Sequence, residues 1–435
     1  MDTRRDFVRK MIGGGVILTH LHANDYPVQP AAGKQNIHGH SLPYTTDNPY
    51  ADVQWDKVKY IPSATHVHVE NQDKLDKIYH RFGLRHIPIS NYYPSAPTYP
   101  IQSIRYNQYA VQQDFGLVYN ADNSKKGNAK WAEGQFREGP FHWNDIIMKG
   151  PHAWASELPA DLQAKLPFQL GDFIFKNVPS DVIVSPNAEH HSFTNAPLHA
   201  CAPGSTYSSG NFDDYDLFKT QDHGYAIGTG LPWETAFRMM IDHLLFPDAG
   251  GITVNHPIWS GLSFDQVVKM LDFDARVLGI EVYNDTCATN YGDPGLGWAL
   301  KLWDDILRTG RRCLGFFVPD HTVGRGKNIL LAPSFTEYEC LKAYRKGAFF
   351  GALSGSGLQF TRISLEDNEL SVAVNDRASI RIVTDKGEAQ KTSGKEAQYK
   401  IPIGTGGTPA ISYVRVEAID EGSEQIFSQP IRFIK

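Results

Sequence analysis

The sequence predicts an α/β fold followed by an all-β domain, on three observations. Short β-rich runs alternate with helical patterns through the middle of the chain, which is typical of a parallel sheet. These runs end in His, Glu, Asp or Asn, and an α/β barrel places its active site at the carboxyl ends of its strands. Beyond residue 357, alternating apolar and polar residues between turn-rich pieces predict a small antiparallel β-sandwich over 357–435.

Composition narrows the class of protein and its partners. The 435 residues are 41% hydrophobic and 21% charged, which is an ordinary globular composition with room for more than one domain. A net charge of -6 offers no basic field for a phosphate backbone, so we expect a small-molecule substrate and no nucleic acid. The cysteines are far apart, which indicates neither a zinc ribbon nor a disulfide framework: Cys201, Cys287, Cys313 and Cys340.

Residues 1–23 resemble a twin-arginine export signal. Arg4 and Arg5 open a basic segment, an apolar stretch follows at 11–18, and we expect cleavage after Ala23. This predicts a periplasmic or extracellular protein, with an amphipathic cytoplasmic start as the alternative. No later apolar run approaches the length that a bilayer requires, so we expect no integral membrane segment in the mature chain. Residues 24–55 lack periodicity and predict an irregular arm.

The stretch 63–70 predicts the first strand of a domain that spans 56–356. In a strand, alternate side chains share a face, so His66, His68 and Glu70 lie together. Two adjacent imidazoles make a metal-ligand pair, and an exposed strand with two histidines is the alternative. A helix follows at 74–82, where apolar residues recur at helical intervals and Gly83 marks the end.

The segment 92–180 is rich in aromatic residues and broken by Pro and Gly. Long irregular insertions in compact domains are usually functional, so one hypothesis is a lid or substrate wall. The alternative is a small subdomain whose aromatic residues form their own core.

Four later β-rich runs each lead to metal-competent side chains. The runs at 182–184, 252–254, 277–283 and 313–318 are followed or ended by Glu189, His256, Glu281 with Asn284, and Asp320 with His321. Helical patterns separate or follow them at 233–246, 263–273, 296–308 and 336–345, and two begin with capping boxes, Ser263 with Gln266 and Thr336 with Glu339. Five strands ending in such residues favour a shared metal site over coincidence.

The order of these motifs resembles the polymerase and histidinol phosphatase (PHP) superfamily of metallohydrolases, especially its carbaryl-hydrolase-like (CehA/McbA) branch. The resemblance covers about 55–355 and rests on the His66-x-His68 pair, the Glu189 to His199 segment, His256-Pro257, the 279–284 run and Asp320-His321. It implies a distorted (β/α)7 TIM-like barrel of PHP type. It also implies a ligand set in which Glu189 bridges two ions: His66, His68, Glu189, His199, His256, Asp320 and His321.

One departure limits the metal count. Members of that superfamily usually carry an Asp-His pair after the second strand, where this chain has Ser90, Asn91 and Tyr92. We therefore expect one or two divalent ions. The mixture of imidazole and carboxylate ligands suits zinc, manganese or iron better than calcium, and zinc or manganese is our prediction.

The predicted chemistry is hydrolysis by metal-activated water of a phosphoester or of a carboxyl or carbamate ester. We expect His256, His321 and Asp320 to be catalytic, one of the histidines donating a proton to the leaving group. The residues predicted to bind substrate are Asn91, Tyr92, Glu281, Asn284 and Arg325, although Arg325 also suits a solvated loop. A PHP-like metal- or ligand-binding protein without catalysis is the alternative. Oligomeric state is not predicted.

Overall fold

The computed structural model describes residues 36–37, 40–41, 44–69, 72–90, 178–191, 193–205, 232–353, 355 and 357–434. The chain divides into two compact units, Met1–Ala32 and Gly33–Lys435, and all described residues belong to the second. The predicted signal at 1–23 and nearly all of the insertion at 92–180 lie outside the described residues. Export and the role of the insertion therefore stay predictions.

A five-stranded sheet contains three of the four later β-rich runs predicted from the sequence. Its order is β11 (Leu314–Val318), β10 (Val277–Asn284), β9 (Ile252–Val254), β8 (Ala200–Cys201) and β7 (Glu189–His190). Strands β9, β10 and β11 run parallel, with Ile280 opposite Val254 and Gly315, whereas β7 and β8 join antiparallel. The parallel strands are fully buried, as expected where helices cover a sheet.

A twelve-stranded sheet contains the remaining large strands. Strands β4 (Lys59–Ser63), β5 (His86–Pro88) and β6 (Ile183–Ser185) are parallel, and antiparallel β12 (Gly326–Ala332) joins them to β13 (Phe349–Leu353). The sheet continues into the C-terminal strands: β18 (Gln425–Ser428), β17 (Tyr413–Asp420), β15 (Glu369–Thr384), β14 (Phe360–Glu366), β16 (Gly387–Lys400), β19 (Ile431–Ile434) and, from the N-terminal arm, β3 (Thr45–Asp47).

The helices match the predicted patterns to within a few residues, except that the short helix at Asp285–Asn290 was not predicted. They are α2 (Gln72–Lys77) with the π-helical turn η1 (Ile78–Phe82), α10 (Trp233–Asp242), α11 (Phe264–Leu271), α12 (Asp285–Asn290), the 3₁₀ turn η5 (Pro294–Gly297), α13 (Leu300–Arg308) and α14 (Glu337–Lys346). Ser263 and Gln266 form the predicted capping box, and the Thr336 side chain accepts a hydrogen bond from the Glu339 amide. Gly83 ends η1 at φ 78°, a conformation that favours glycine.

No closed barrel is found among the described strands, which form a mixed α/β, sheet-rich arrangement of open sheets. The two large sheets nevertheless meet around one region. Val67, beyond the end of β4, bridges to Asp320, and the Glu189 amide donates to the Ser90 carbonyl at 3.0 Å. These contacts are isolated and form no continuous ladder between the two sheets among the described residues. They still bring the strand ends together.

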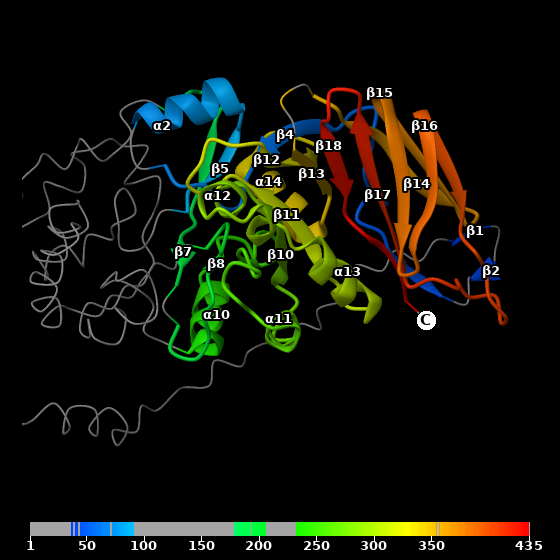
Figure 1. Cartoon of the computed structure of the whole chain (residues 1–435), viewed down its shortest axis with the longest axis horizontal. Helices are drawn as coiled ribbons and strands as arrows, with labels where there is room; N and C mark the ends of the chain where they lie inside the picture. Colours follow the sequence, from blue (N-terminus) through cyan, green and yellow to red (C-terminus); the bar gives the residue numbers. More distant parts are fainter. Residues whose placement is uncertain are drawn as a thin grey trace, which may run out of the picture. The chain divides into compact units, whose positions relative to one another are not determined.

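Strands β15 and β19 alternate buried with more exposed residues over most of their length, as predicted, whereas β17 is buried from Tyr413 to Ala418. The C-terminal strands are not a separate sheet. Phe350 on β13 pairs with Ser428 on β18, so the parallel strands and the C-terminal strands are hydrogen-bonded into one surface. Figure 1 shows β14 to β17, in orange and red, to one side of helices α11 and α13. Buried Arg415 on β17 binds Asp304 of α13 through Nε and Nη2, at 2.9 and 3.0 Å.

Part of the predicted irregular arm has regular structure. Strand β3 pairs with β19, and Tyr44 and Tyr50 are buried in the core beneath the C-terminal strands. β1 (Asn36–Ile37) and β2 (His40–Ser41) form a separate antiparallel pair. Across the described residues, no helix is long and apolar enough to span a membrane.

Replacing Gly279 by Ala should destabilise the fold. A Cβ at this position of β10 would overlap the Leu314 backbone of the neighbouring strand β11. Because hydrogen bonds fix the two backbones in register, the strands cannot move apart to make room for the added methyl group. We expect the free energy of unfolding to fall by about 1–3 kcal/mol. Urea unfolding followed by circular dichroism measures the change.

Gly404→Ala is the matched control, since its added Cβ meets only ordinary contacts at 3.6 Å or beyond. It should change stability by less than about 0.5 kcal/mol. A Gly279→Ala protein as stable as this control would contradict the register of β10 and β11.

Candidate metal centre

Four buried side chains converge where the two sheets meet: His66, His68, Glu189 and Asp320. The Nε2 atom of His66 lies 3.2 Å from each of His68 Nε2, Glu189 Oε2 and Asp320 Oδ1. The Nε2 atom of His68 lies 2.9 Å from Glu189 Oε2 and 3.4 Å from Asp320 Oδ1. Four donor atoms from three separate chain segments thus face one another.

Backbone pairing places the two histidines. The predicted strand at 63–70 differs from the structure, in which β4 ends at Ser63 and the chain then leaves its ladder to join the end of β11. There the His68 amide donates to the Asp320 carbonyl at 3.1 Å, and the Asp320 amide donates to the His66 carbonyl at 3.0 Å. The extended alternation survives locally, so Val67 is buried away from the two imidazoles.

Glu189 also belongs to a second group. Its Oε1 lies 2.7 Å from His199 Nδ1 and 3.2 Å from His256 Nε2, and all three side chains are buried. The β7–β8 pairing brings His199 beside Glu189, and the Asn255 amide donates to the His199 carbonyl at 2.9 Å. One carboxylate therefore offers a different oxygen to each group.

Glu281 and Asn284 lie behind these ligands. Glu281 Oε1 is 2.8 Å from His66 Nδ1, and Oε2 accepts hydrogen bonds from the His256 amide at 2.8 Å and from Asn284 Nδ2 at 2.9 Å. Asn284 also donates to Asp320 Oδ2 at 3.1 Å. A proton on His66 Nδ1 that faces Glu281 leaves the lone pair of Nε2 directed at the four-residue group. The buried positions of Glu281 and Asn284 suit residues that orient the candidate metal ligands. The sequence had predicted that both residues bind substrate.

The electrostatics of the cluster follow from burial and opposite charges. Burial acts to lower the pKa of His66, but the Asp320 and Glu189 carboxylates outweigh it and hold that pKa well above its usual range. Burial and neighbouring His321 lower the pKa of His68 to about 4, so His68 is neutral at pH 7. Burial opposes ionisation of Glu189, yet His66 and His199 hold its pKa well below the ordinary value.

These donors fit a divalent cation. Asp320 Oδ1 is buried and accepts no hydrogen bond from the described part of the chain, and the only cationic groups near it are the cluster histidines, with His66 Nε2 at 3.2 Å among the described residues. The neutral imidazole of His68 and the Nε2 atom of His66 face the same space, and a bound cation would take the place of the second proton that the carboxylates favour on His66. Imidazole and carboxylate donors together suit zinc or manganese.

Backbone strain coincides with two candidate ligands. Among the described residues, His256 at φ 24° and Asp320 at φ 58° are two of five non-glycine residues with positive φ. Such conformations persist where surrounding contacts determine them, and they cluster at functional sites. The Thr286 hydroxyl oxygen provides such contacts, because it accepts from the His321 amide at 2.9 Å and the Thr322 amide at 3.2 Å and donates to the Pro319 carbonyl at 3.1 Å.

His321 lies at the edge of the cluster. Its ring stacks on His68 with centroids 3.7 Å apart, its side chain is 38% exposed, and its Nε2 is 3.7 Å from Asp320 Oδ1. It belongs to neither of these ligand groups, nor to a third candidate group of described residues formed by His66, His256 and Glu281. The sequence predicted both a ligand and a catalytic role for His321, and its position favours contact with a substrate.

The remaining predicted residues lie elsewhere. Exposed Arg325 has Nη2 3.3 Å from the Ser423 carbonyl and 3.5 Å from the Leu353 carbonyl, and it joins none of the ligand groups. Asn91 and Tyr92 fall outside the described residues. Their predicted role in substrate binding stays a prediction.

Sequence reasoning missed Thr286 and Trp259. The ring of Trp259 packs edge-on against His256 and His199, with centroids 4.9 and 5.5 Å apart. Trp259 follows His256 by three residues, a weak signal of proximity. No sequence pattern marked Thr286, because its role depends on a loop that lies more than thirty residues away.

No protein-family model and no curated protein sequence matches this chain. Among solved structures, it is similar to a two-domain protein from Bacteroides vulgatus ATCC 8482 whose description names a predicted PHP-like metal-dependent phosphoesterase. The similarity covers 84% of this chain and 92% of that chain, with 12% sequence identity and a TM-score of 0.34. A similarity this weak supports no argument about fold or activity, so the site must be judged from its own residues.

Replacing Glu281 by Gln should weaken the binding of zinc or manganese by about 10–100-fold, the usual effect of losing a partner that orients a ligand. The amide keeps the size of the side chain but loses its charge and one of the two acceptor oxygens that serve His66 and His256. Titration against a competing chelator measures the affinity.

Glu234→Gln, on the partly exposed face of α10, is the control and should leave the affinity unchanged. Equal affinities for the two variants would show that Glu281 does not orient the ligands.

Proposed function

We propose that this protein is a metal-dependent hydrolase that acts on a phosphoester or on a carboxyl or carbamate ester. The observation that carries the proposal is the pair of buried ligand groups that share Glu189, with His66, His68 and Asp320 on one side and His199 and His256 on the other. This arrangement suits one or two divalent ions, with zinc or manganese preferred over calcium. When bound, such an ion supplies Lewis acidity and lowers the pKa of a bound water to about 7.

The residues of the chain then have distinct expected tasks. Glu281 orients His66, and Asn284 holds one oxygen of Asp320 so that the other faces the ligand group. His321 is the better proton donor of the two predicted histidines because its side chain is partly exposed. His256, by contrast, is buried, with Nε2 near Glu189 and Nδ1 3.1 Å from the Ser260 hydroxyl. General acid catalysis requires a group within hydrogen-bonding reach of the leaving group.

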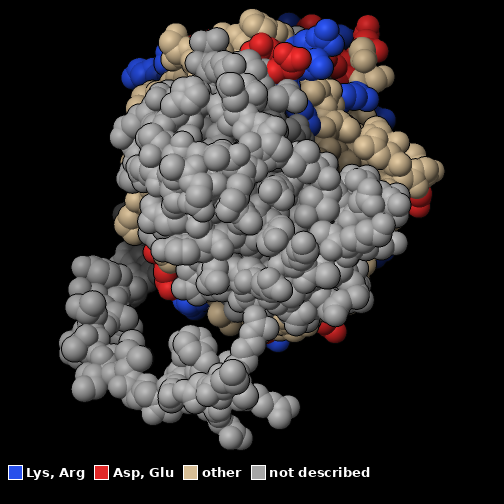
Figure 2. Space-filling view, turned by 90° about the vertical axis from the view of Figure 1, so that its left-hand side faces the viewer, with Lys and Arg blue, Asp and Glu red and all other residues tan. Residues whose placement is uncertain are grey.

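The finer classification is also a proposal. We assign the chain to the PHP superfamily, with a distorted barrel, on the order of its motifs and on the two links that join the sheets, Val67 with Asp320 and Glu189 with Ser90. The net charge of -6 favours a small-molecule substrate over nucleic acid. Figure 2 shows acidic and basic side chains intermixed over the described residues of the face in view.

The activity is tested by metal analysis together with a panel of phosphoester, carboxyl ester and carbamate substrates. We expect stoichiometric metal in protein purified without chelator, loss of turnover after chelation, and recovery on adding zinc or manganese. Asp320→Asn should lower turnover by more than about 100-fold, because losing a ligand exceeds the effect of losing an outer partner.

Asp376→Asn, at an exposed position of β15, is the matched control and should retain full activity. Stoichiometric metal without turnover across the panel would instead identify a metal-binding protein that lacks catalysis. Full metal content in both His66→Ala and Asp320→Ala would show that the ion binds elsewhere.

We also propose export through the twin-arginine route, supported by Arg4 and Arg5 ahead of the apolar stretch at 11–18. In a bacterial host with that pathway, the processed protein should reach the periplasm. The double variant Arg4→Lys with Arg5→Lys should remain in the cytoplasm at full length, whereas Arg9→Lys should still be exported. Periplasmic recovery of the double variant would contradict the proposal.

A further inference from the structure

A cavity lies apart from the candidate metal centre. It has a volume of about 400 Å³ and lies between the end of η1, the start of β12 and the chain that leads into β14. None of its lining residues belongs to a ligand group: Pro62, Arg81, Phe82, Gly83, Gly324, Arg325, Lys327, Ile329, Gly355, Gly357, Leu358 and Gln359. Its volume falls within the usual range for small-molecule sites.

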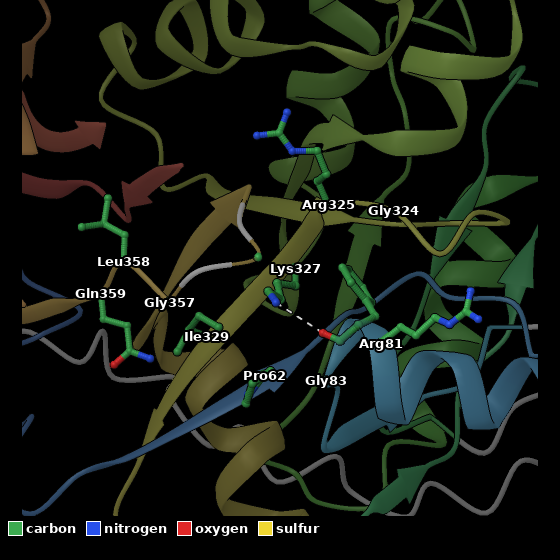
Figure 3. Close-up of a pocket in the computed structure, with 12 residues that line it drawn as sticks. Pro62, Arg81, Gly83, Gly324, Arg325, Lys327, Ile329, Gly357, Leu358 and Gln359 are labelled. Atoms are coloured by element: carbon green, nitrogen blue, oxygen red, sulfur yellow. Dashed lines mark hydrogen bonds between the residues drawn. The ribbon is translucent and has the colours of Figure 1, made fainter. Parts of the chain in front are cut away.

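The lining of this pocket is positively charged. Three of the lining residues are basic, Arg81, Arg325 and Lys327, and none is acidic, in a chain whose net charge is -6. Among the described residues, no carboxylate forms an ion pair with any of the three. Figure 3 shows Lys327 near the centre of the pocket, with Arg325 above it and Arg81 to its right, and the two guanidinium groups are directed away from Lys327.

Lys327 is the least solvated of the three. Its ammonium donates to the Phe82 carbonyl at 3.3 Å and lies 5.1 Å from the centre of the Phe82 ring. Burial lowers its pKa, and Glu424 only partly opposes this effect. An ammonium has three N–H donors, and the Phe82 carbonyl accepts from the Lys327 ammonium. An anion in the pocket would accept further hydrogen bonds from it.

The acidic residues nearby are already engaged by the backbone. Glu424, which acts on Lys327, accepts hydrogen bonds from the amides of Gly355 at 2.7 Å and Leu358 at 3.3 Å. Asp285, whose charge acts on Arg325, accepts from the Gly326 amide at 2.7 Å and from the Arg325 backbone amide. Neither carboxylate neutralises the pocket by direct contact with its cations.

Part of the remaining wall is apolar. Phe82, Ile329 and Leu358 are buried around the pocket, and Pro62 lies beside Ile329 in the paired strands β4 and β12. A Cβ added at Gly83 or Gly357 would meet nothing within 4 Å, so space is open beside both glycines. The pocket thus combines a charged group with apolar surface.

We propose that this pocket binds a small organic oxyanion, whose phosphate or carboxylate group contacts Lys327 and Arg325 and whose apolar body packs against Phe82 and Leu358. The site is independent of the proposed hydrolase activity. It recognises the ligand by charge at one end and by apolar contact at the other.

Calorimetric titration of the full chain with phenylphosphonate, which resists hydrolysis, tests the proposal. We expect binding that persists after the metal is removed by a chelator, because no lining residue is a candidate metal ligand. Lys327→Met keeps the aliphatic stem and should weaken binding by about tenfold, the loss expected for one charge-assisted hydrogen bond. Benzoate should bind at the same residues, and neutral benzyl alcohol should not bind.

Arg325→Gln provides a second variant at an exposed position, where substitution spares the core, and it should also weaken binding. Arg238→Gln is the matched control, since Arg238 is an exposed arginine on α10 and is absent from the pocket lining. Binding that disappears with the metal would place the anion at the metal centre and overturn the proposal. Affinity unchanged in both Lys327→Met and Arg325→Gln, equal binding of benzyl alcohol, or no binding of phenylphosphonate would also overturn it.

Discussion

The Glu189 carboxylate has one oxygen 2.9 Å from His68 Nε2 and the other 2.7 Å from His199 Nδ1, and the side chain is almost wholly buried. Burying a carboxylate costs free energy unless charged or hydrogen-bonding partners surround it. His66 and His199 supply that compensation, because they hold the Glu189 pKa well below its usual range. The placement of the surrounding strand ends depends on this one group, since its two oxygens require partners from both large sheets.

The surrounding chain restricts how those partners can move. Glu281 holds His66 through its side chain and His256 through its backbone amide, so one carboxylate orients a ligand in each group. Asp320 and His256 keep strained backbone angles, and the Thr286 hydroxyl holds the loop that carries Asp320. Positions that are held this firmly are expected where ligand geometry matters to function.

Much of the local structure could be predicted from the sequence because it depends on neighbouring residues. The helical patterns, the Ser263 capping box and the shared face of His66 and His68 follow from periodicity and spacing. The grouping of Glu189, His256 and Asp320 followed from their positions at strand ends. The role of Glu281 was harder to predict, because a buried carboxylate that orients a ligand and an exposed one that binds substrate have the same sequence signature.

The sequence by itself determined the chemistry available to this protein: buried imidazoles and carboxylates at the ends of β-rich runs, with helices between them and alternating strands after residue 357. Only the tertiary structure decided which oxygen of Glu189 meets which histidine, that the C-terminal strands continue the sheet of β4 to β6, and that Arg81, Arg325 and Lys327 line one pocket. The physical reason is distance along the chain. Periodicity and capping act over a few residues, whereas these contacts join segments separated by tens to hundreds of residues, and packing alone selects among their alternatives.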